Sequence, residues 1–105
     1  MALPEDMKKT IRARLQSDYA FRFALLSEAV EGLLMDDLPT AKSVLHDYID
    51  ATIGFTELSS QTGLPEKNLM WMFSEDGNPR ADSLFNVLAV LQKSQGIQFA
   101  VNAAA

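Results

Sequence analysis

Side chains that carry out covalent or metal chemistry are sparse in this chain of 105 residues. There is no cysteine and a single histidine, His46, so the chain has no thiolate nucleophile and no set of spaced ligands for a metal ion. Serine hydroxyls form no credible triad with one histidine. The adjacent acids Asp36 and Asp37 precede Pro39, where capping of a helix explains them better than catalysis. We therefore predict no enzymatic activity, no catalytic residue, no metal site and no cofactor.

Residues 59–79, SSQTGLPEKNLMWMFSEDGNP, suit contact with a nucleic acid instead. Two short helical patterns flank Gly63, and glycine adopts the left-handed conformation of a tight turn without steric strain. Ser59 is the small residue required where two helices cross steeply. Apolar residues then recur at a spacing that pins the second helix onto the first: Leu64, Leu69, Met72 and Phe73. The pattern is typical of a helix-turn-helix, whose second helix enters the major groove of DNA.

The face of the second helix opposite this apolar set should be exposed and available to DNA. It carries Glu66, Lys67, Met70, Trp71 and Ser74. A lysine reaches a guanine edge or a phosphate, a methionine lies against a thymine methyl, and an indole stacks on a sugar or donates to a phosphate. The glutamate repels phosphate but accepts a hydrogen bond from the amino group of cytosine. In the alternative interpretation, the methionine and the tryptophan are core residues beneath the amino-terminal helices.

The elements that must position this stretch are helical nearly throughout. Apolar residues at three- and four-residue steps predict helices at residues 4–15, 19–33, 39–54, 55–62, 65–74 and 79–95. Asn78 is placed to cap the last of these helices and Pro79 to begin it. Arg80 should then hold a DNA phosphate at the amino terminus of that helix.

The segment after Gly96, IQFAV, alternates apolar residues with others and predicts a short β-strand. A lone strand in a helical chain has no partner for its backbone groups. The segment must therefore pair with a second protein, pair with its own copy across a two-fold axis, or be a coil that happens to alternate.

Length and composition fit a single domain over residues 1–105. We divide it into a helical extension (1–38), a helix-turn-helix core (39–95) and a strand or tail (96–105). No apolar run is long enough to span a bilayer, and MALPEDMKKT at the amino terminus lacks the apolar stretch of a signal peptide. The sequence predicts a cytoplasmic protein with no membrane contact.

A formal net charge of -5 opposes binding to random DNA, because non-specific affinity comes largely from neutralised phosphates. Residues 1–51 hold six Lys/Arg against nine acids, and residues 52–105 hold three against five. One such module makes few phosphate contacts, whereas a two-fold pair doubles them over two half-sites. We therefore expect a homodimer, formed through the carboxy-terminal strand or the aromatic-rich helix at residues 19–33.

Residues 53–95 resemble the Cro/Xre-type helix-turn-helix domain. The stretch FSEDGNPRADSLFNVLAVLQ is similar to the loop and Leu-rich helix of HigA-like antitoxins, the addiction module antidote group, and LHDYIDATIGFTELSSQTGLP also resembles members of that group. The resemblance covers roughly the last half of the chain. It departs at Ser59, usually alanine in the family, and at Pro65-Glu66, where many members have serine or threonine. It implies base contacts at residues 66, 67, 70 and 71 and backbone contacts at residues 74 and 80.

The expected fold is an all-α, Cro/Xre-like helix-turn-helix bundle with an amino-terminal helical extension and a possible short carboxy-terminal β-strand. The expected function is binding of a double-stranded DNA operator by a transcriptional regulator, an antitoxin-like autorepressor. A toxin partner is implied by the resemblance alone. The alternative is an interaction module with the same fold that no longer binds DNA, in which Met70 and Trp71 form a protein-binding patch.

Overall fold

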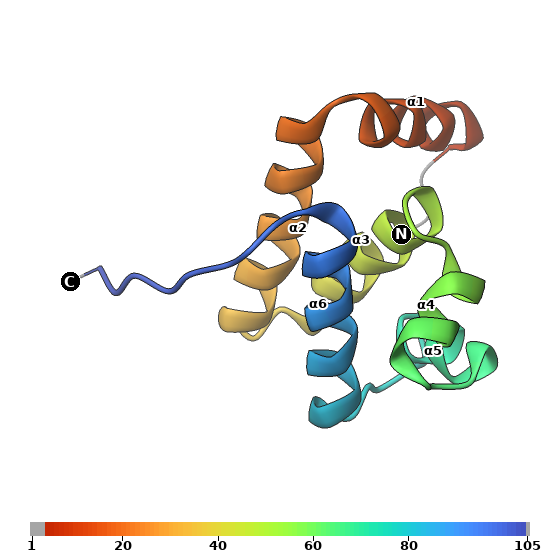
Figure 1. Ribbon diagram of the computed structural model, residues 1–105, viewed down its shortest axis with the longest axis vertical. Coiled ribbons are helices and arrows are strands. Elements are labelled where there is room, and N and C mark those ends of the chain that lie inside the picture. The colour runs from red at the N-terminus through yellow and green to blue at the C-terminus, as the bar shows by residue number, and fades with distance from the viewer. Residues whose placement is uncertain (1–3, 105) are drawn as a thin grey trace.

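The computed structural model describes residues 4–104, which form six helices and no β-strand (Figure 1). The helices are α1 (Glu5–Ser17), α2 (Tyr19–Leu34), α3 (Leu38–Ala51), α4 (Phe55–Thr62), α5 (Glu66–Met72) and α6 (Ala81–Gln95). The predicted all-α class is confirmed. Within the described residues, no helix combines the length and the apolar character needed to cross a membrane.

The corner between α1 and α2 forms at Asp18, where the sequence predicts a break. The carboxylate of Asp18 accepts a hydrogen bond from the backbone N–H of Phe21 at 3.1 Å, which caps the first turn of α2. In α1, Leu15 is fully buried, Ile11 is partly buried and Met7 is 49% exposed. Helix α1 therefore attaches to the rest of the protein mainly through its second half.

Helices α2 and α3 form a hairpin and pack along each other more extensively than any other pair (Figure 1). Gly32 of α2 faces Ala41 of α3 at this contact, and a Cβ at position 32 would lie 3.5 Å from the Cβ of Ala41, an ordinary van der Waals distance. Asp37 caps α3 by accepting a hydrogen bond from the backbone N–H of Thr40. The predicted capping role is confirmed for Asp37, whereas Asp36 forms the turn itself with a left-handed φ of 59°.

The core is centred on α3, which contacts α1, α2 and α4. Each of the helices α1 to α6 contributes at least one apolar side chain that is almost fully buried: Leu15, Leu26, Leu45, Tyr48, Ile49, Leu58, Leu69, Val87 and Leu91. The spacing of Leu84, Val87, Leu88 and Leu91 predicts the apolar stripe of α6, and the structure buries all four. The helical spacing of the apolar residues in α2 predicts a packing seam of Tyr19, Phe23, Leu26, Val30 and Leu33. The seam is wrong at its first two positions, because Leu26 and Ala29 define the buried face and leave Tyr19 and Phe23 about half exposed.

Helix α6 begins two residues later than predicted. Arg80 occupies the N-cap position and Ala81 is the first helical residue, so Asn78 and Pro79 belong to the preceding loop. The same loop contacts α3, where Nζ of Lys42 donates a hydrogen bond to the carbonyl of Gly77 at 2.6 Å. This contact holds the loop beside α3, and the backbone is extended at Arg80 before the helix begins.

The predicted β-strand after α6 is also wrong, because the tail up to residue 104 forms no regular secondary structure. Ile97 is buried, and the ring of Phe99 stacks on that of Phe23 with centroids 6.3 Å apart. The backbone N–H of Phe99 donates to the side-chain oxygen of Gln92 at 2.8 Å. The tail is therefore a coil that lays alternate side chains against α2 and α6 before it leaves the body of the protein (Figure 1).

Candidate nucleic-acid interface

The turn between α4 and α5 is closed by hydrogen bonds from both backbone and side chains. Gly63 has a left-handed φ of 76°, and its N–H donates to the carbonyl of Ser59 at 3.0 Å. The hydroxyl of Ser59 donates to the carbonyl of Leu64 at 2.6 Å, and Oγ1 of Thr62 accepts from the N–H of Leu64. From the sequence, Ser59 was expected only to be small. Its hydroxyl also fixes the angle at which the chain enters α5.

Helix α5 and its C-cap residue present an apolar side to the core and a mixed side to solvent. The inward side chains are at most 5% exposed: Leu69, Met72 and Phe73. Met70 and Trp71 are 47% and 52% exposed, so they are not core residues beneath the amino-terminal helices. Glu66 and Lys67 are exposed on the same helix. The face that the sequence predicts for DNA is therefore open in the described chain.

The first turn of α5 is tied to the first turn of α4 through Glu66. Its Oε1 accepts a hydrogen bond from Oγ1 of Thr56 at 3.1 Å. This contact orients the carboxylate at the outer edge of the helix pair. The next residue, Lys67, takes part in no ion pair with any residue between 4 and 104. Its ammonium group is therefore available to an external acceptor.

The loop after α5 packs closely against the end of that helix. The hydroxyl of Ser74 donates to the carbonyl of Trp71 at 2.7 Å, and the N–H of Ser74 donates to the same oxygen. Gly77 lies over this carbonyl so tightly that a Cβ on it meets the Trp71 oxygen at 1.7 Å. The predicted contact residue Ser74 is therefore half-buried and has an internal hydrogen-bond partner.

A buried lysine holds the same loop from the other side. Lys42 of α3 is only 8% exposed, and its Nζ donates to the carbonyls of Glu75 and Gly77 at 3.1 Å and 2.6 Å. Carbonyl oxygens at this distance replace the water that a buried ammonium group loses. The sequence analysis did not identify this lysine as buried. Its position would have indicated it, because it falls on the side of the helix that carries the buried apolar residues.

Arg80 lies at the amino terminus of α6, as predicted, but its guanidinium already has a partner. Its Nε and Nη2 donate to the two carboxylate oxygens of Asp82 at 3.2 Å and 3.3 Å. The hydrogen bond from Arg80 is the main reason that the pKa of Asp82 lies below its usual value, and the N–H of Ser83 adds to the effect. Both side chains are largely exposed, so the pair is weak and exchangeable.

The electrostatic balance of this surface is acidic rather than basic. Lys67 and Arg80 supply its positive charges. Exposed carboxylates on the same segment offset them: Glu66, Glu75, Asp76 and Asp82. A surface with this balance gives no net attraction for a phosphate backbone, so any affinity for DNA must come from directed contacts.

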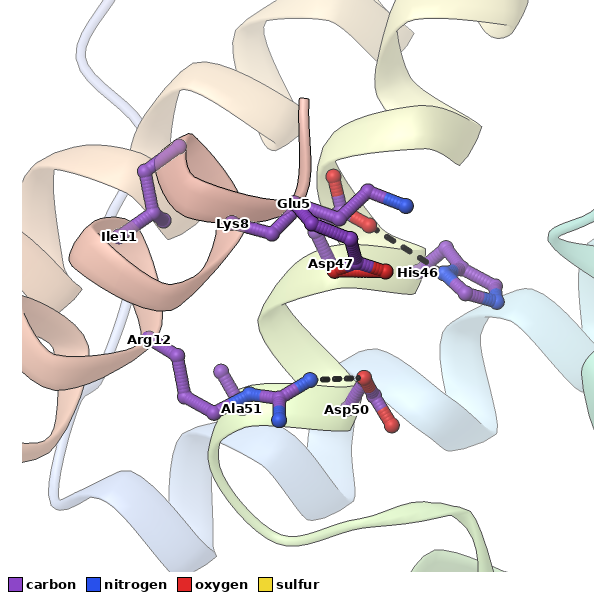
Figure 2. Close-up of a pocket in the computed structure, with 8 residues that line it drawn as sticks. All are labelled: Glu5, Lys8, Ile11, Arg12, His46, Asp47, Asp50 and Ala51. Carbon is purple, nitrogen blue, oxygen red and sulfur yellow. Dashed lines mark hydrogen bonds and ion pairs between the residues drawn. The ribbon is translucent and has the colours of Figure 1, made fainter. Parts of the chain in front are cut away.

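A hollow lies between α1 and α3 (Figure 2). This hollow of about 130 Å³ is lined mainly by charged side chains, and none of its lining residues carries a hydroxyl or thiol nucleophile. Arg12 reaches across it to Asp50 at 2.7 Å, and Nδ1 of His46 lies 3.3 Å from Oδ1 of Asp47 (Figure 2). In residues 4–104, no three histidine or acidic side chains are grouped to hold a metal ion. The ion pair from Arg12 ties α1 to α3.

An apolar surface lies where the tail crosses α2. It consists of Tyr19, Phe23 and Phe99, and we call it the α2–tail patch. Tyr19 and Phe23 are 52% and 44% exposed, and Phe99 is half-buried. No charged residue occurs between positions 96 and 104. The patch is therefore an uncharged surface on a protein of net charge -5.

Comparison of the chain with protein-family models, curated proteins and solved structures finds no match. What the α5 surface binds must therefore be inferred from the chemistry of its own residues.

Proposed function

We propose that the protein is a sequence-specific DNA-binding transcriptional regulator with a Cro/Xre-type helix-turn-helix, in which α5 enters the major groove. In this proposal it binds its own operator as a cytoplasmic homodimer and acts as an antitoxin-like autorepressor. The observation that supports it best is the orientation of α5. Leu69 is fully buried, whereas Met70 and Trp71 in the same two-turn helix are half exposed beside Lys67.

The exposed side chains of α5 offer complementary base contacts. Lys67 donates to the acceptors of a guanine edge or to a phosphate, and Met70 packs against a thymine methyl. Glu66, oriented by Thr56, accepts a hydrogen bond from the amino group of a cytosine. Trp71 lies against a sugar or donates its indole N–H to a phosphate. This set discriminates bases without a large basic surface.

For the contacts with the DNA backbone, two side chains must exchange an internal hydrogen-bond acceptor for a phosphate. Ser74 must release the carbonyl of Trp71, and Arg80 must release the carboxylate of Asp82, before either donates to a phosphate. The Arg80–Asp82 ion pair is largely exposed and is worth only about 0–1 kcal/mol, and the hydrogen bond of the Ser74 hydroxyl is worth about 0.5–1.5 kcal/mol. A phosphate of the operator is therefore able to compete for both donors.

The number of positive charges at the interface sets the expected salt dependence. With Lys67 and Arg80 from each protomer, a dimer neutralises about four phosphates, so log K against log salt should have a slope of about −3 to −4. A gel shift of the protein with its own upstream region, repeated at several salt concentrations, measures this slope. A scrambled duplex of equal length is the control. The absence of a specific complex at low salt contradicts the proposal.

The α2–tail patch is the surface best suited to a second copy of the chain. The chain has a formal net charge of -5, so two copies of this acidic protein repel each other wherever acidic groups face one another. The patch lacks charge and carries half-exposed aromatic rings, including Tyr19 and Phe23. A two-fold axis through it pairs the same apolar surface with itself.

Phe23→Glu is expected to convert the dimer into a monomer at micromolar concentration, because it places two carboxylates at the two-fold contact. Light scattering coupled to size exclusion measures the mass, and circular dichroism checks that helix content is retained. Phe85→Glu is the matched control, since Phe85 is 66% exposed on α6, outside the patch. A dimer that survives Phe23→Glu but not Phe85→Glu places the interface on α6 instead.

The toxin partner rests on the resemblance of the sequence to antitoxins. Residues 1–51 carry nine acids against six Lys/Arg, a balance that suits a basic, RNA-cutting enzyme. A small basic protein encoded in the adjacent reading frame, and its co-purification with this chain, supports that part of the proposal. The DNA-binding part stands without it.

A second candidate function is protein binding by the α5 surface without DNA recognition. It is favoured by the ion pair that occupies Arg80 and by the adjacent exposed apolar side chains of Met70 and Trp71. The gel shift separates the two functions: a chain that forms no complex with its upstream DNA at low salt is an interaction module.

A further inference from the structure

A buried lysine without a counter-ion lies between α3 and the loop that follows α5. Lys42 is the only charged side chain within residues 4–104 that is buried, at 8% exposure. Its ammonium group forms no ion pair with any carboxylate in that range. Burial of a charge without a counter-ion is costly, and an apolar side chain at this position of α3 would avoid the cost. The packing of α3 alone therefore does not account for a lysine here.

Two backbone carbonyls of the loop take the place of a counter-ion. Nζ of Lys42 donates to the carbonyl of Glu75 at 3.1 Å and to that of Gly77 at 2.6 Å. In the described chain, no other hydrogen bond joins residues 75–79 to a helix. Lys42 is therefore the polar link between α3 and this loop.

The loop in turn supports the end of α5. Gly77 packs so closely on the carbonyl group of Trp71 that a Cβ at position 77 would meet its oxygen at 1.7 Å and its carbon at 2.7 Å. Helix α5 spans only seven residues and packs chiefly against α4. The contact with Gly77 therefore gives the last turn of α5 a second support, which leads back to α3 through Lys42.

We propose that Lys42 is a positioning residue for the α5 surface: through the carbonyl of Gly77 it holds the last turn of α5 and so fixes the direction of the Trp71 side chain. The inference rests on the DNA-binding proposal, in which Trp71 contacts the sugar–phosphate backbone. Lys42 is buried and does not contact DNA itself. Its loss lowers affinity because the last turn of α5 and the indole must then be ordered on binding.

The positioning role is tested first without DNA, by the fluorescence anisotropy decay of Trp71, the only tryptophan in the chain. Lys42→Met removes both hydrogen bonds and keeps a side chain of similar length, so the share of nanosecond local motion in the decay should rise. Lys42→Gln keeps N–H donors without the charge, and it should show the same effect at reduced size. Equal motion of Trp71 in the parent and in both variants overturns the proposal.

Two control substitutions separate this effect from a change of charge or of stability. Lys93→Met makes the same change at an exposed lysine of α6, and Ile49→Val trims a fully buried side chain of α3. Both should leave the motion of Trp71 as it is in the parent. A rise of the same size in Ile49→Val overturns the proposal, because any loosening of α3 then has the same result.

The second test is the affinity for the upstream DNA, measured by gel shift at several salt concentrations. Lys42→Met should bind about tenfold more weakly than the parent, since the indole of each protomer is no longer held in place. The salt slope should stay parental, because no phosphate contact is lost. In a Trp71→Ala background the same substitution should cost less than about twofold, because the contact through which Lys42 acts is absent.

The outcomes distinguish this inference from the proposal on which it rests. An equal loss of affinity with and without Trp71, or a flatter salt slope in Lys42→Met, overturns the positioning role. A parent that forms no specific complex overturns the DNA-binding proposal instead, and the anisotropy decay still decides whether Lys42 positions Trp71.

Discussion

Replacement of Gly77 with alanine is expected to lower the free energy of unfolding by about 2–3 kcal/mol. A Cβ at this position lies 1.7 Å from the carbonyl oxygen of Trp71, 2.7 Å from its carbonyl carbon and 3.0 Å from the oxygen of Met72. These are backbone atoms at the end of α5, so they cannot rotate away as a flexible side chain does. Either the loop or the end of the helix must move.

Gly32→Ala is the matched control for this substitution. Its added Cβ meets the Cβ of Ala41 at 3.5 Å, an ordinary van der Waals contact, and the position is within a helix. Alanine there is expected to stabilise the protein by about 0.5–1 kcal/mol. Urea unfolding followed by circular dichroism measures both variants. A Gly77→Ala protein as stable as the parent contradicts the packing of the loop against α5.

The charge reversal Lys67→Glu is expected to weaken operator binding by about a hundredfold or more, since each of two protomers loses a contact worth about 1–3 kcal/mol. The new carboxylate also repels phosphate and lies beside Glu66, which is already acidic. Lys67 forms no ion pair within residues 4–104, so helix content and Tm should not change. A gel shift with the upstream region, and a melting curve of the free protein, measure the two effects.

Lys9→Glu is the control for the change in net charge, because Lys9 is exposed on α1, far from α5 (Figure 1). It should weaken binding only slightly. Arg80→Glu should also abolish binding while it leaves the fold intact, although it breaks the ion pair with Asp82. If Lys67→Glu binds the operator as tightly as Lys9→Glu, then α5 does not face the DNA.

The orientation of α5 was predictable from the sequence because apolar spacing determines which side of a short helix is buried. Leu69, Met72 and Phe73 recur at helical steps after Gly63, and the structure buries all three. The capping by Asp18 and Asp37 was predictable for a similar reason, since a side chain acts there on its own neighbouring backbone.

The contacts that position the loop after α5 could not be predicted in the same way. Lys42 and Gly77 are 35 residues apart, and their hydrogen bond depends on how α3 packs beside the loop. The position of the tail could not be predicted either. Its alternating pattern fits a strand, but Phe99 finds its partner in Phe23, a residue of α2. Local patterns do not encode which distant side chain will be nearby.

The solvent exposure of Trp71 provides the most direct test of the central claim, because it is the only tryptophan in the chain. Its fluorescence should be quenched readily by acrylamide in the free protein, where the side chain is 52% exposed. Addition of the upstream DNA should protect it, whereas a scrambled duplex should not. Quenching that stays unchanged in a complex whose formation is verified by gel shift would show that DNA binds elsewhere and that α5 is not the reading helix.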